Sequence, residues 1–284
     1  MFPPVSPIVL RLIILNVAVF LLLAVFGSAL PFDLREQLML YYPGSRDFLP
    51  VQLVSHFFLH AGLSHLFYNM FGLYVFGPAI EDRLGQRNFV LLYLIAACGS
   101  AALHLGMTWF EIFQGQRGLE AFLADPGLAT FTDFFNGEDL VGQSYVSGNG
   151  QRTSIARVVG DITNALSLNG ATPQELAQAR TAIEVYVGGI GENPMLGASG
   201  AVSGVLAAYL FFYPFRELRL FLLPVSLPAW VVIVFLLATD FTMGFLSIPG
   251  DNVAHFAHIG GAIAGGIAAY FFAKQPPSWM KRIN

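Results

Sequence analysis

Long uncharged stretches of apolar residues alternate with shorter polar segments along most of this chain. Six stretches reach about 20 residues, the length that an α-helix needs to cross the hydrocarbon core of a bilayer. They predict membrane-spanning helices at roughly 8–28, 54–77, 88–107, 196–213, 228–247 and 252–273. The first stretch is long and has no small-residue cleavage pattern before Pro31, so we expect it to stay in the membrane rather than act as a signal peptide.

One polar segment, 111–192, separates the third and fourth of these helices and is too long for a simple loop. Its first half carries three turn signals, Asp125-Pro126-Gly127, Asn136-Gly137 and Gly148-Asn149-Gly150. Its second half carries two apolar stripes at helical spacing, Ile155/Val158/Val159/Ile162/Leu166 and Leu176/Ala179/Ile183/Val187. Asn169-Gly170 ends the first of these helices, and Thr172-Pro173-Gln174-Glu175 begins the second as a capping box.

These patterns divide the chain into residues 1–110 with helices 1–3, a polar and mainly helical insertion at 111–192, and residues 193–284 with helices 4–6. The insertion is predicted to be a helical hairpin that packs on itself or lies on the membrane surface. A module that binds a partner or a substrate is the alternative. The glycines at 188, 189 and 191 predict a flexible return to the membrane.

Composition supports the membrane assignment and excludes several other classes of protein. Of 284 residues, 55% are hydrophobic and 11% are charged, against about a quarter charged in a soluble domain. Aromatic residues make up 14% of the chain, which excludes disorder, and a net charge of −4 gives no basic footprint for nucleic acid. The one cysteine, Cys98, excludes a disulfide within the chain and a multi-cysteine metal site.

Basic residues near the ends of the predicted helices indicate the orientation of the chain. They are Arg11, Arg83, Arg87, Arg216, Arg219, Lys274, Lys281 and Arg282. All of them fall on one side if both termini are cytoplasmic, in agreement with the excess of Lys and Arg in cytoplasmic loops. We therefore expect a multi-pass protein of the bacterial inner (plasma) membrane with both termini in the cytoplasm and the insertion on the opposite side.

The strongest local signal for chemistry is Gly197-Ala198-Ser199-Gly200, at the start of the fourth predicted helix. A serine hydroxyl among small residues at a helix entrance is accessible, and free backbone N–H groups there can hold a developing oxyanion. Gly200 and Gly204 also form a GxxxG pattern, which serves helix packing in membranes. Taken alone, the motif favours packing.

A second signal, His255-Phe256-Ala257-His258, opens the sixth predicted helix. A histidine within a membrane is costly and is a functional candidate by default. His258 lies one turn before a further GxxxG pattern, Gly261 and Gly265, where a neighbouring helix can approach closely. Ser199 and His258 are both expected about 5–10 Å below the outer ends of their helices, the ends away from the cytoplasm. This shared depth suits a Ser–His dyad. Without the serine, an interfacial or metal-binding role for the two histidines would be favoured.

A third signal lies in the second predicted helix, which carries His56, His60, His65 and Asn69. His65 and Asn69 are four residues apart and share a helical face, so their N–H donors can be aimed at one point. His56 and His60 lie nearer the surface. Zinc is the alternative, but no HExxH pattern accompanies these histidines, and thiolate ligands are limited to one cysteine.

Together these motifs resemble the rhomboid family of intramembrane serine proteases. The resemblance rests on Phe58-Leu59-His60-Ala61-Gly62 with His65-Leu66-Phe67-Tyr68-Asn69, on Gly197-Ala198-Ser199-Gly200, and on Ala257-His258-Ile259-Gly260-Gly261. Glu81, Gly85, Phe89 and Tyr93 also resemble the family's entry into its third helix. The resemblance implies an all-α bundle of six transmembrane helices, here with a helical extracytoplasmic insertion between helices 3 and 4.

The resemblance also implies roles for individual residues. Ser199 is the nucleophile, His258 is the general base and then the acid, and the oxyanion donors are His65, Asn69 and the Ser199 N–H. The supporting residues would be His60, Ser203, Gly197 and Gly200. The implied reaction is hydrolysis of peptide bonds in or near transmembrane segments of other proteins, with no metal and no cofactor. The implied partners are transmembrane protein substrates and the lipid bilayer, not nucleic acid, and the sequence does not specify the oligomeric state.

Two features depart from the family's pattern. Family members often carry an aromatic residue four positions after the serine, and here Ser203 takes that place as a possible hydrogen-bond partner of His258. The connection of about 80 residues before the fourth helix is also longer than the family's usual one. Asp240 either orients His258 or extends to the membrane interface, and the sequence favours the interface. A catalytically inactive rhomboid-like protein that binds membrane-protein clients is the alternative function, and a transporter is a weaker one.

Overall fold

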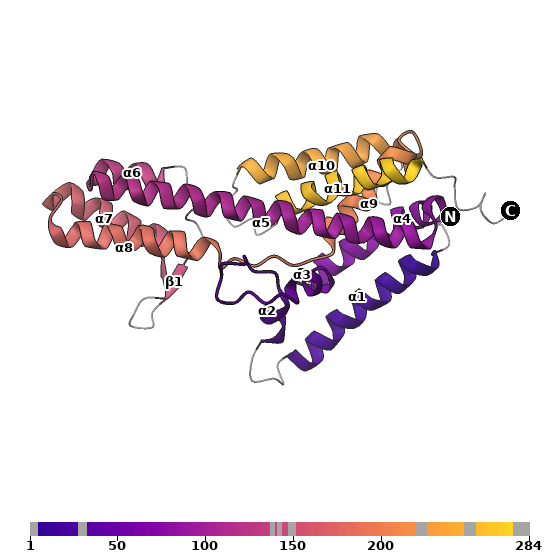
Figure 1. Cartoon of the computed structure of the whole chain (residues 1–284), viewed down its shortest axis with the longest axis horizontal. Coiled ribbons are helices and arrows are strands. Elements are labelled where there is room, and N and C mark those ends of the chain that lie inside the picture. The colour runs from indigo at the N-terminus through magenta and orange to yellow at the C-terminus, as the bar shows by residue number, and fades with distance from the viewer. Residues whose placement is uncertain are drawn as a thin grey trace.

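The computed structural model describes residues 5–27, 33–136, 140, 144–146, 152–219, 226–246 and 254–274. This part of the chain is mostly helical (Figure 1). The longer apolar helices are α1 (Pro7–Phe26), α4 (Leu63–Leu84), α5 (Gln86–Ala124), α9 (Ser199–Phe212), α10 (Ala229–Leu246) and α11 (His255–Ala273). The turn signal at 148–150, Gly137 of another, and the basic residues Lys281 and Arg282 lie outside the described residues.

Short elements connect these helices. Between α1 and α4 lie α2 (Leu34–Leu38), α3 (Gln52–Ser55) and the 3-10 turn η2 (His56–Phe58). Between α5 and α9 lie α6 (Leu128–Phe135), α7 (Ile155–Asn169) and α8 (Pro173–Ile190). Two antiparallel hairpins pair β1 (Ser144–Val146) with β2 (Arg152–Ser154) and β3 (Glu217–Arg219) with β4 (Ser226–Pro228).

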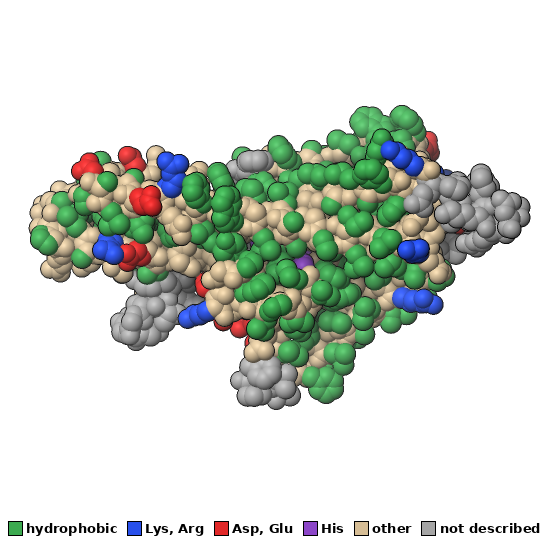
Figure 2. Space-filling model, viewed as in Figure 1, with side chains coloured by type: hydrophobic (Ala, Val, Ile, Leu, Met, Phe, Trp, Pro, Cys, Tyr) green, Lys and Arg blue, Asp and Glu red, His purple; other side chains and the backbone are tan. Residues whose placement is uncertain are grey.

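A helix lies at each of the six predicted apolar segments, with one clear shift. The second was expected from residue 54, but α4 begins at Leu63, after the separate turns of α3 and η2 and an extended Gly62. Within the described residues, α1, α5 and α11 are long and apolar enough to cross a membrane, and α9 and α10 are shorter apolar helices. Hydrophobic side chains cover much of the surface over this part of the molecule, whereas acidic and basic residues gather over α6–α8 (Figure 2).

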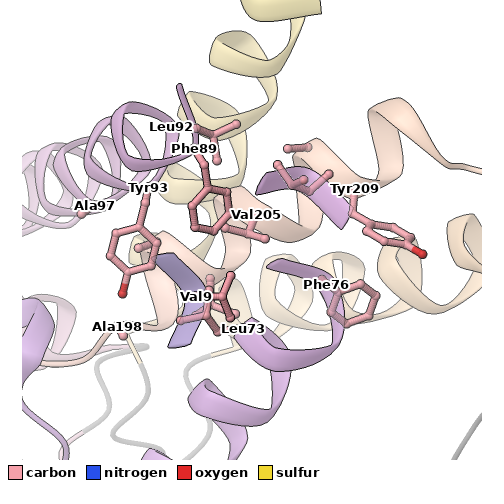
Figure 3. Close-up of a cluster of buried hydrophobic side chains, with 14 of the residues drawn as sticks. Val9, Leu73, Phe76, Phe89, Leu92, Tyr93, Ala97, Ala198, Val205 and Tyr209 are labelled. Carbon is pink, nitrogen blue, oxygen red and sulfur yellow. The ribbon is translucent and has the colours of Figure 1, made fainter. Parts of the chain in front are cut away.

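The apolar helices share one core, in which Leu73 of α4, Phe89 and Tyr93 of α5, and Val205 of α9 are buried (Figure 3). Ala198, the residue before Ser199, is fully buried in this same core. Between helices in a bilayer, such side chains contribute through close van der Waals packing. The start of α9 is therefore anchored to the most firmly packed region of the fold.

A buried carboxylate joins the beginning of α1 to the end of α4. Glu81 is 3% exposed, and it accepts hydrogen bonds from the Ser6 hydroxyl and from the backbone N–H groups of Ile8 and Val9. These N–H groups have no partner within the helix, so the carboxylate satisfies them and interacts favourably with the helix dipole. Glu81 is thus a structural residue in this fold.

Helix α5 is longer than the predicted third span and passes through the boundary placed at residue 110. It runs for 39 residues without a break, about 58 Å, which exceeds the hydrocarbon thickness of a bilayer. The residues after Phe110 were expected to begin a separate insertion, but they continue the helix and pack on α6 and α8. A Cβ on Gly115 would lie 2.8 Å from Val187 of α8. We call α6, α7, α8 and α5 from Gly115 onward the distal unit.

The distal unit has its own hydrophobic core, to which both α7 and α8 contribute. The buried residues include Phe122, Phe131, Phe135, Ile162, Leu166, Ala179, Ile183 and Val187. Helix α7 ends at Asn169 as predicted, with Gly170 at a φ of +77°, and the Thr172 side chain accepts from the N–H of Glu175. The glycines at 188 and 189 were expected to be flexible, but they belong to α8, because Val187 and Ile190 pack against Gly115.

Candidate active site

Ser199 is the first residue of α9, and the segment before it is fastened to the region between α1 and α4. Met195 and Leu40 exchange two backbone hydrogen bonds of 2.9 Å, and the Gly197 N–H donates to the carbonyl of His56 at 2.9 Å. His56 is itself buried and contacts the Gln52 carbonyl through Nδ1 at 2.6 Å. This network fixes the entry to α9 from outside the helix.

Gly197 allows the entry to α9 to take its shape. Its φ is +127°, a region that residues with a Cβ rarely adopt. A Cβ at this position would lie 2.8 Å from Cε1 of His65 and 3.4 Å from the hydroxyl oxygen of Ser199. Glycine therefore keeps open the space between the His65 ring and the serine hydroxyl.

The start of α9 offers unpaired backbone donors. Ala198 occupies the N-cap position, and no side chain caps the helix there. The first N–H groups of a helix have no partner within it, and they carry the positive end of the helix dipole. Ser199 thus combines a partly exposed hydroxyl with backbone N–H donors, as a nucleophile beside an oxyanion site requires.

Helices α9 and α11 meet through glycine at very short range, which brings the elements carrying Ser199 and His258 together. The backbone carbonyl of Gly200 lies directly against Gly261, and Gly204 lies directly against Gly265, so that neither pair has room for a side chain. A Cβ on Gly200 would lie 3.3 Å from the carbonyl of Ala257. Ser199 and His258 are the chain neighbours of Gly200 and Ala257, so the two residues flank this contact.

The same contact bears on the packing role considered for the Gly197–Gly200 motif. The predicted GxxxG faces of α9 and α11 do pack together, and Ser100 of α5 also lies against Gly200. Packing and chemistry are therefore compatible, since the glycines bring the helices together while Ser199 stands at the edge of their contact.

His65 lies on the other side of the Ser199 hydroxyl, with its tautomer set by the backbone. The Ala61 N–H donates to Nδ1 of His65 at 3.3 Å, so the ring proton resides on Nε2. Nε2 faces Gly197: a Cβ on Gly197 would lie 3.0 Å from Nε2 and 3.4 Å from the Ser199 hydroxyl oxygen. His65 is also near enough to His258 for the two rings to interact electrostatically.

Two buried polar side chains near His65 lack hydrogen-bond partners within the described residues. They are Asn69, through Nδ2, and His60, through both ring nitrogens, with exposures of 5% and 3%. The His60 and His65 rings meet edge to face with centroids 5.2 Å apart. Buried polar groups are almost always satisfied by protein or water, so these atoms are candidates to donate to a bound substrate or to water.

The position of Asp240 corrects one sequence-based interpretation. Asp240 was expected at the membrane interface, but its Oδ1 lies 2.9 Å from Nδ1 of His258 and 2.9 Å from Nδ1 of His255. Asp240 is on α10 and both histidines are on α11, so the carboxylate joins the two helices. An acidic residue within an apolar stretch is itself a functional signal, and that signal pointed to Asp240.

The other proposed support for the His258 ring is Ser203, which is 6% exposed and lies in the packed interior of α9. The hydrogen-bond partner that the structure gives to Nδ1 of His258 is Asp240. The carboxylate therefore occupies the supporting role for which Ser203 was considered.

Two sets of histidines were considered as metal ligands, one on α11 and one around the start of α4. Within the described residues, one group of three side chains is placed to hold a metal ion, namely Asp240, His255 and His258, with ligand atoms all within 4.8 Å of one another. The zinc alternative at His56, His60 and His65 does not form such a group there.

Comparisons with known proteins identify the family of this chain. A profile described as the rhomboid domain matches residues 49–115 and 162–275. The chain is 24% identical over 262 residues to RHOMBOID-like protein 12, mitochondrial, of Arabidopsis thaliana, covering 92% of this chain and 57% of that protein. It is 32% identical over 82 residues to Rhomboid protein 1, mitochondrial, of Saccharomyces cerevisiae, covering 29% of this chain and 23% of that protein. It is 29% identical over 94 residues to Rhomboid protease GlpG of Yersinia pestis, covering 32% of each. The chain thus spans little more than half of the first relative and less of the others.

Proposed function

This chain belongs to the rhomboid family, and from that premise we propose that it is an intramembrane serine endopeptidase that hydrolyses peptide bonds in or near transmembrane segments of other proteins. The family is one of multi-pass membrane proteins that includes intramembrane proteases. The observation that carries the proposal is the glycine contact between α9 and α11, because it places the chain neighbours of Ser199 and His258 against each other.

The proposed reaction begins with Ser199. Its hydroxyl attacks the scissile carbonyl carbon while Nε2 of His258 accepts the hydroxyl proton. The carbonyl oxygen becomes an oxyanion, which accepts hydrogen bonds from Nε2–H of His65, from Nδ2–H of Asn69 and from the Ser199 N–H. His258 then gives its proton to the leaving amine as the peptide C–N bond breaks. Water hydrolyses the acyl-enzyme by the same steps and releases the serine.

Asp240 acts in this scheme as a positioning residue. A carboxylate that accepts a hydrogen bond from Nδ1–H of His258 holds the tautomer in which Nε2 carries a lone pair. It also stabilises the imidazolium that forms when Nε2 takes the serine proton. The proposal thus extends the Ser–His dyad to a Ser199–His258–Asp240 arrangement.

The proposed topology has six membrane-spanning helices, α1, α4, α5, α9, α10 and α11, with both termini on the cytoplasmic side. The excess of Lys and Arg at one end of the helices supports this orientation. The site and the distal unit then lie toward the opposite side, where water can reach the buried polar groups of His60 and Asn69. Relatives that match this chain include proteins named mitochondrial as well as bacterial ones, so the type of membrane is left open.

The test of this function uses a fluorophosphonate probe, which labels activated serines, together with cleavage of a membrane-anchored substrate. The unmodified protein should be labelled at Ser199 and should cleave the substrate, and Ser199→Ala should do neither while unfolding at the same temperature. Ser203→Ala is the matched control, and it should keep the label and measurable cleavage. Labelling mapped to Ser203 would reverse the two roles, and no labelling of the unmodified protein would favour the inactive, client-binding alternative.

A further inference from the structure

We propose that Asp240, His255 and His258 form a binding site for a zinc-class divalent cation, and that the bound cation switches the protease off. The site goes beyond catalysis, and its regulatory effect rests on the function proposed above. The three side chains come from two helices, Asp240 from α10 and both histidines from α11. Both histidine rings contact the same carboxylate oxygen, Oδ1 of Asp240, which lies 2.9 Å from Nδ1 of each ring.

The geometry of the cluster is close to that of a metal site. In tetrahedral zinc coordination, bonds of about 2.0–2.1 Å place neighbouring ligand atoms about 3.3 Å apart. Here all three ligand atoms lie within 4.8 Å of one another, and both nitrogen–oxygen separations are 2.9 Å. An opening of a few tenths of an ångström between the carboxylate and each ring would admit the ion. His255 and His258 are three residues apart, so one face of α11 presents both rings.

The chemistry of the three ligand atoms indicates which metal ions the site would bind. Two imidazole nitrogens and one carboxylate oxygen suit zinc and related transition metals, whereas magnesium and calcium prefer oxygen ligands alone. The side chains of Asp240, His255 and His258 are 21%, 12% and 16% exposed, so the cluster is enclosed yet open to entry. Three protein ligands leave the fourth position of a tetrahedral ion for water.

The regulatory effect follows from the protons of the His258 ring. A neutral imidazole carries one ring proton, and hydrogen bonding to Asp240 keeps that proton on Nδ1, leaving the lone pair of Nε2 for the Ser199 proton. A zinc ion bound at Nδ1 occupies the lone pair there, so the single ring proton resides on Nε2. Nε2 then cannot accept a proton from serine. The carboxylate and the zinc ion thus select opposite tautomers of the same base.

His255 is the residue that separates the two roles of the cluster. His258 and Asp240 serve both the proposed reaction and the proposed metal site, whereas His255 serves the metal site. Removing the His255 imidazole leaves a two-ligand site, and losing a ligand should weaken zinc binding by at least about tenfold. Each variant is compared with its own metal-free rate, so a change in basal activity does not enter the result.

Binding is measured first, without reference to activity, on full-length protein in detergent with the affinity tag removed. Titration calorimetry with zinc chloride on the Ser199→Ala variant should give one site per chain, and cobalt should give the visible absorption of a tetrahedral ion. Adding His255→Ala or Asp240→Asn to that variant should weaken zinc binding by at least about tenfold and remove the tetrahedral cobalt spectrum. His104→Gln is the matched control, a histidine of α5 outside the cluster, and it should keep them. No saturable zinc binding, or binding unchanged by His255→Ala, overturns the proposal.

Inhibition is measured second, by peptide hydrolysis with and without zinc, followed by a chelator. The unmodified protein should lose at least about tenfold in rate with zinc and recover with the chelator, and magnesium should have no effect. His255→Ala should lose less than about twofold. Zinc binding without inhibition, or activation by zinc, overturns the regulatory part. If the metal-free protein neither hydrolyses peptide nor takes up the fluorophosphonate probe, the proposed function fails, while the binding experiment still decides the metal site.

Discussion

The backbone carbonyl of Gly200 lies directly against Gly261, and this contact sets the distance between the two helices that carry Ser199 and His258. Gly261→Ala should therefore push α9 and α11 apart, destabilise the protein by about 1–3 kcal/mol and remove most of its peptidase activity. Thermal unfolding in detergent and peptide hydrolysis measure the two effects.

Gly266→Ala is the matched control for this change, because it lies on the same helix and a Cβ there would be 3.8 Å from Ala207, an ordinary contact. It should keep activity and, through the better helix propensity of alanine, lose no stability. Equal behaviour of the two variants would contradict the role given to the Gly200–Gly261 contact.

Asp240→Asn tests the positioning of His258. The amide nearly preserves the shape of the side chain, but it no longer offers a carboxylate to Nδ1–H, so kcat should fall by about 100-fold or more, as the same change does in Ser-His-Asp proteases. KM and the unfolding temperature should change little. Asp161→Asn, at an exposed position of α7, serves as the control. A loss confined to KM, or to folding, would assign Asp240 a structural role instead.

His258→Ala should abolish activity as fully as Ser199→Ala, whereas His255→Ala should remain partly active in metal-free buffer. The reason is that His258 lies one turn from Gly261, where α9 closes on α11, while the His255 ring contacts Asp240 and meets the His258 ring edge to face. Rates of fluorophosphonate labelling distinguish the two. Complete loss in both variants would indicate a metal that activates rather than inhibits.

Asn69 is expected to supply one of several oxyanion donors. Asn69→Ala should lower kcat by about 10- to 100-fold, less than either dyad change, since a single donor contributes on the order of 3 kcal/mol and its neighbours compensate in part. Asn69→Asp keeps the size of the side chain but replaces the donor by an acceptor. It should be at least as inactive as Asn69→Ala, and restored activity in this variant would mean that Asn69 acts through packing.

The distal unit is expected to be dispensable for the chemical step. Gly115 and Val187 are in contact, so a short Gly/Ser linker can replace 116–187 between positions that already lie side by side. This variant should still hydrolyse a short peptide and take up the probe, whereas its cleavage of membrane-anchored proteins should change. A folded variant that has lost both peptide hydrolysis and labelling would make the distal unit part of the catalytic machinery.

How much the sequence predicted depends on the kind of interaction. The apolar segments located the six main helices because burial in lipid demands length and low charge, and both can be read from residues in order. The stop at Gly170 and the cap at Thr172 were also predictable, since they depend on local backbone chemistry. The depth of 5–10 Å expected for Ser199 and His258 differs from the structure, because α9 begins at Ser199 itself and α11 begins at His255.

Other features depend on contacts between distant segments. The polar residues after Phe110 suggested the start of a separate insertion, and the extension of α5 became visible only with Phe122 and Val187 packed in the distal core. The Asp240–His258 hydrogen bond joins two helices whose rotation about their axes the sequence leaves unspecified. The Ala61–His65 bond, which sets the tautomer of a predicted donor, depends on a turn that precedes α4 rather than on the helix expected there.

Because α5 is unbroken, it sets a fixed distance between the proposed nucleophile and the distal unit. Ser100 lies against Gly200, and Gly115, where the distal unit begins, is 15 positions further along the same helix. That separation is about 22 Å, the span of about seven residues of extended chain. Under the proposed function, an extended substrate held at the start of the distal unit would therefore reach Ser199 about seven residues from the point where it is held.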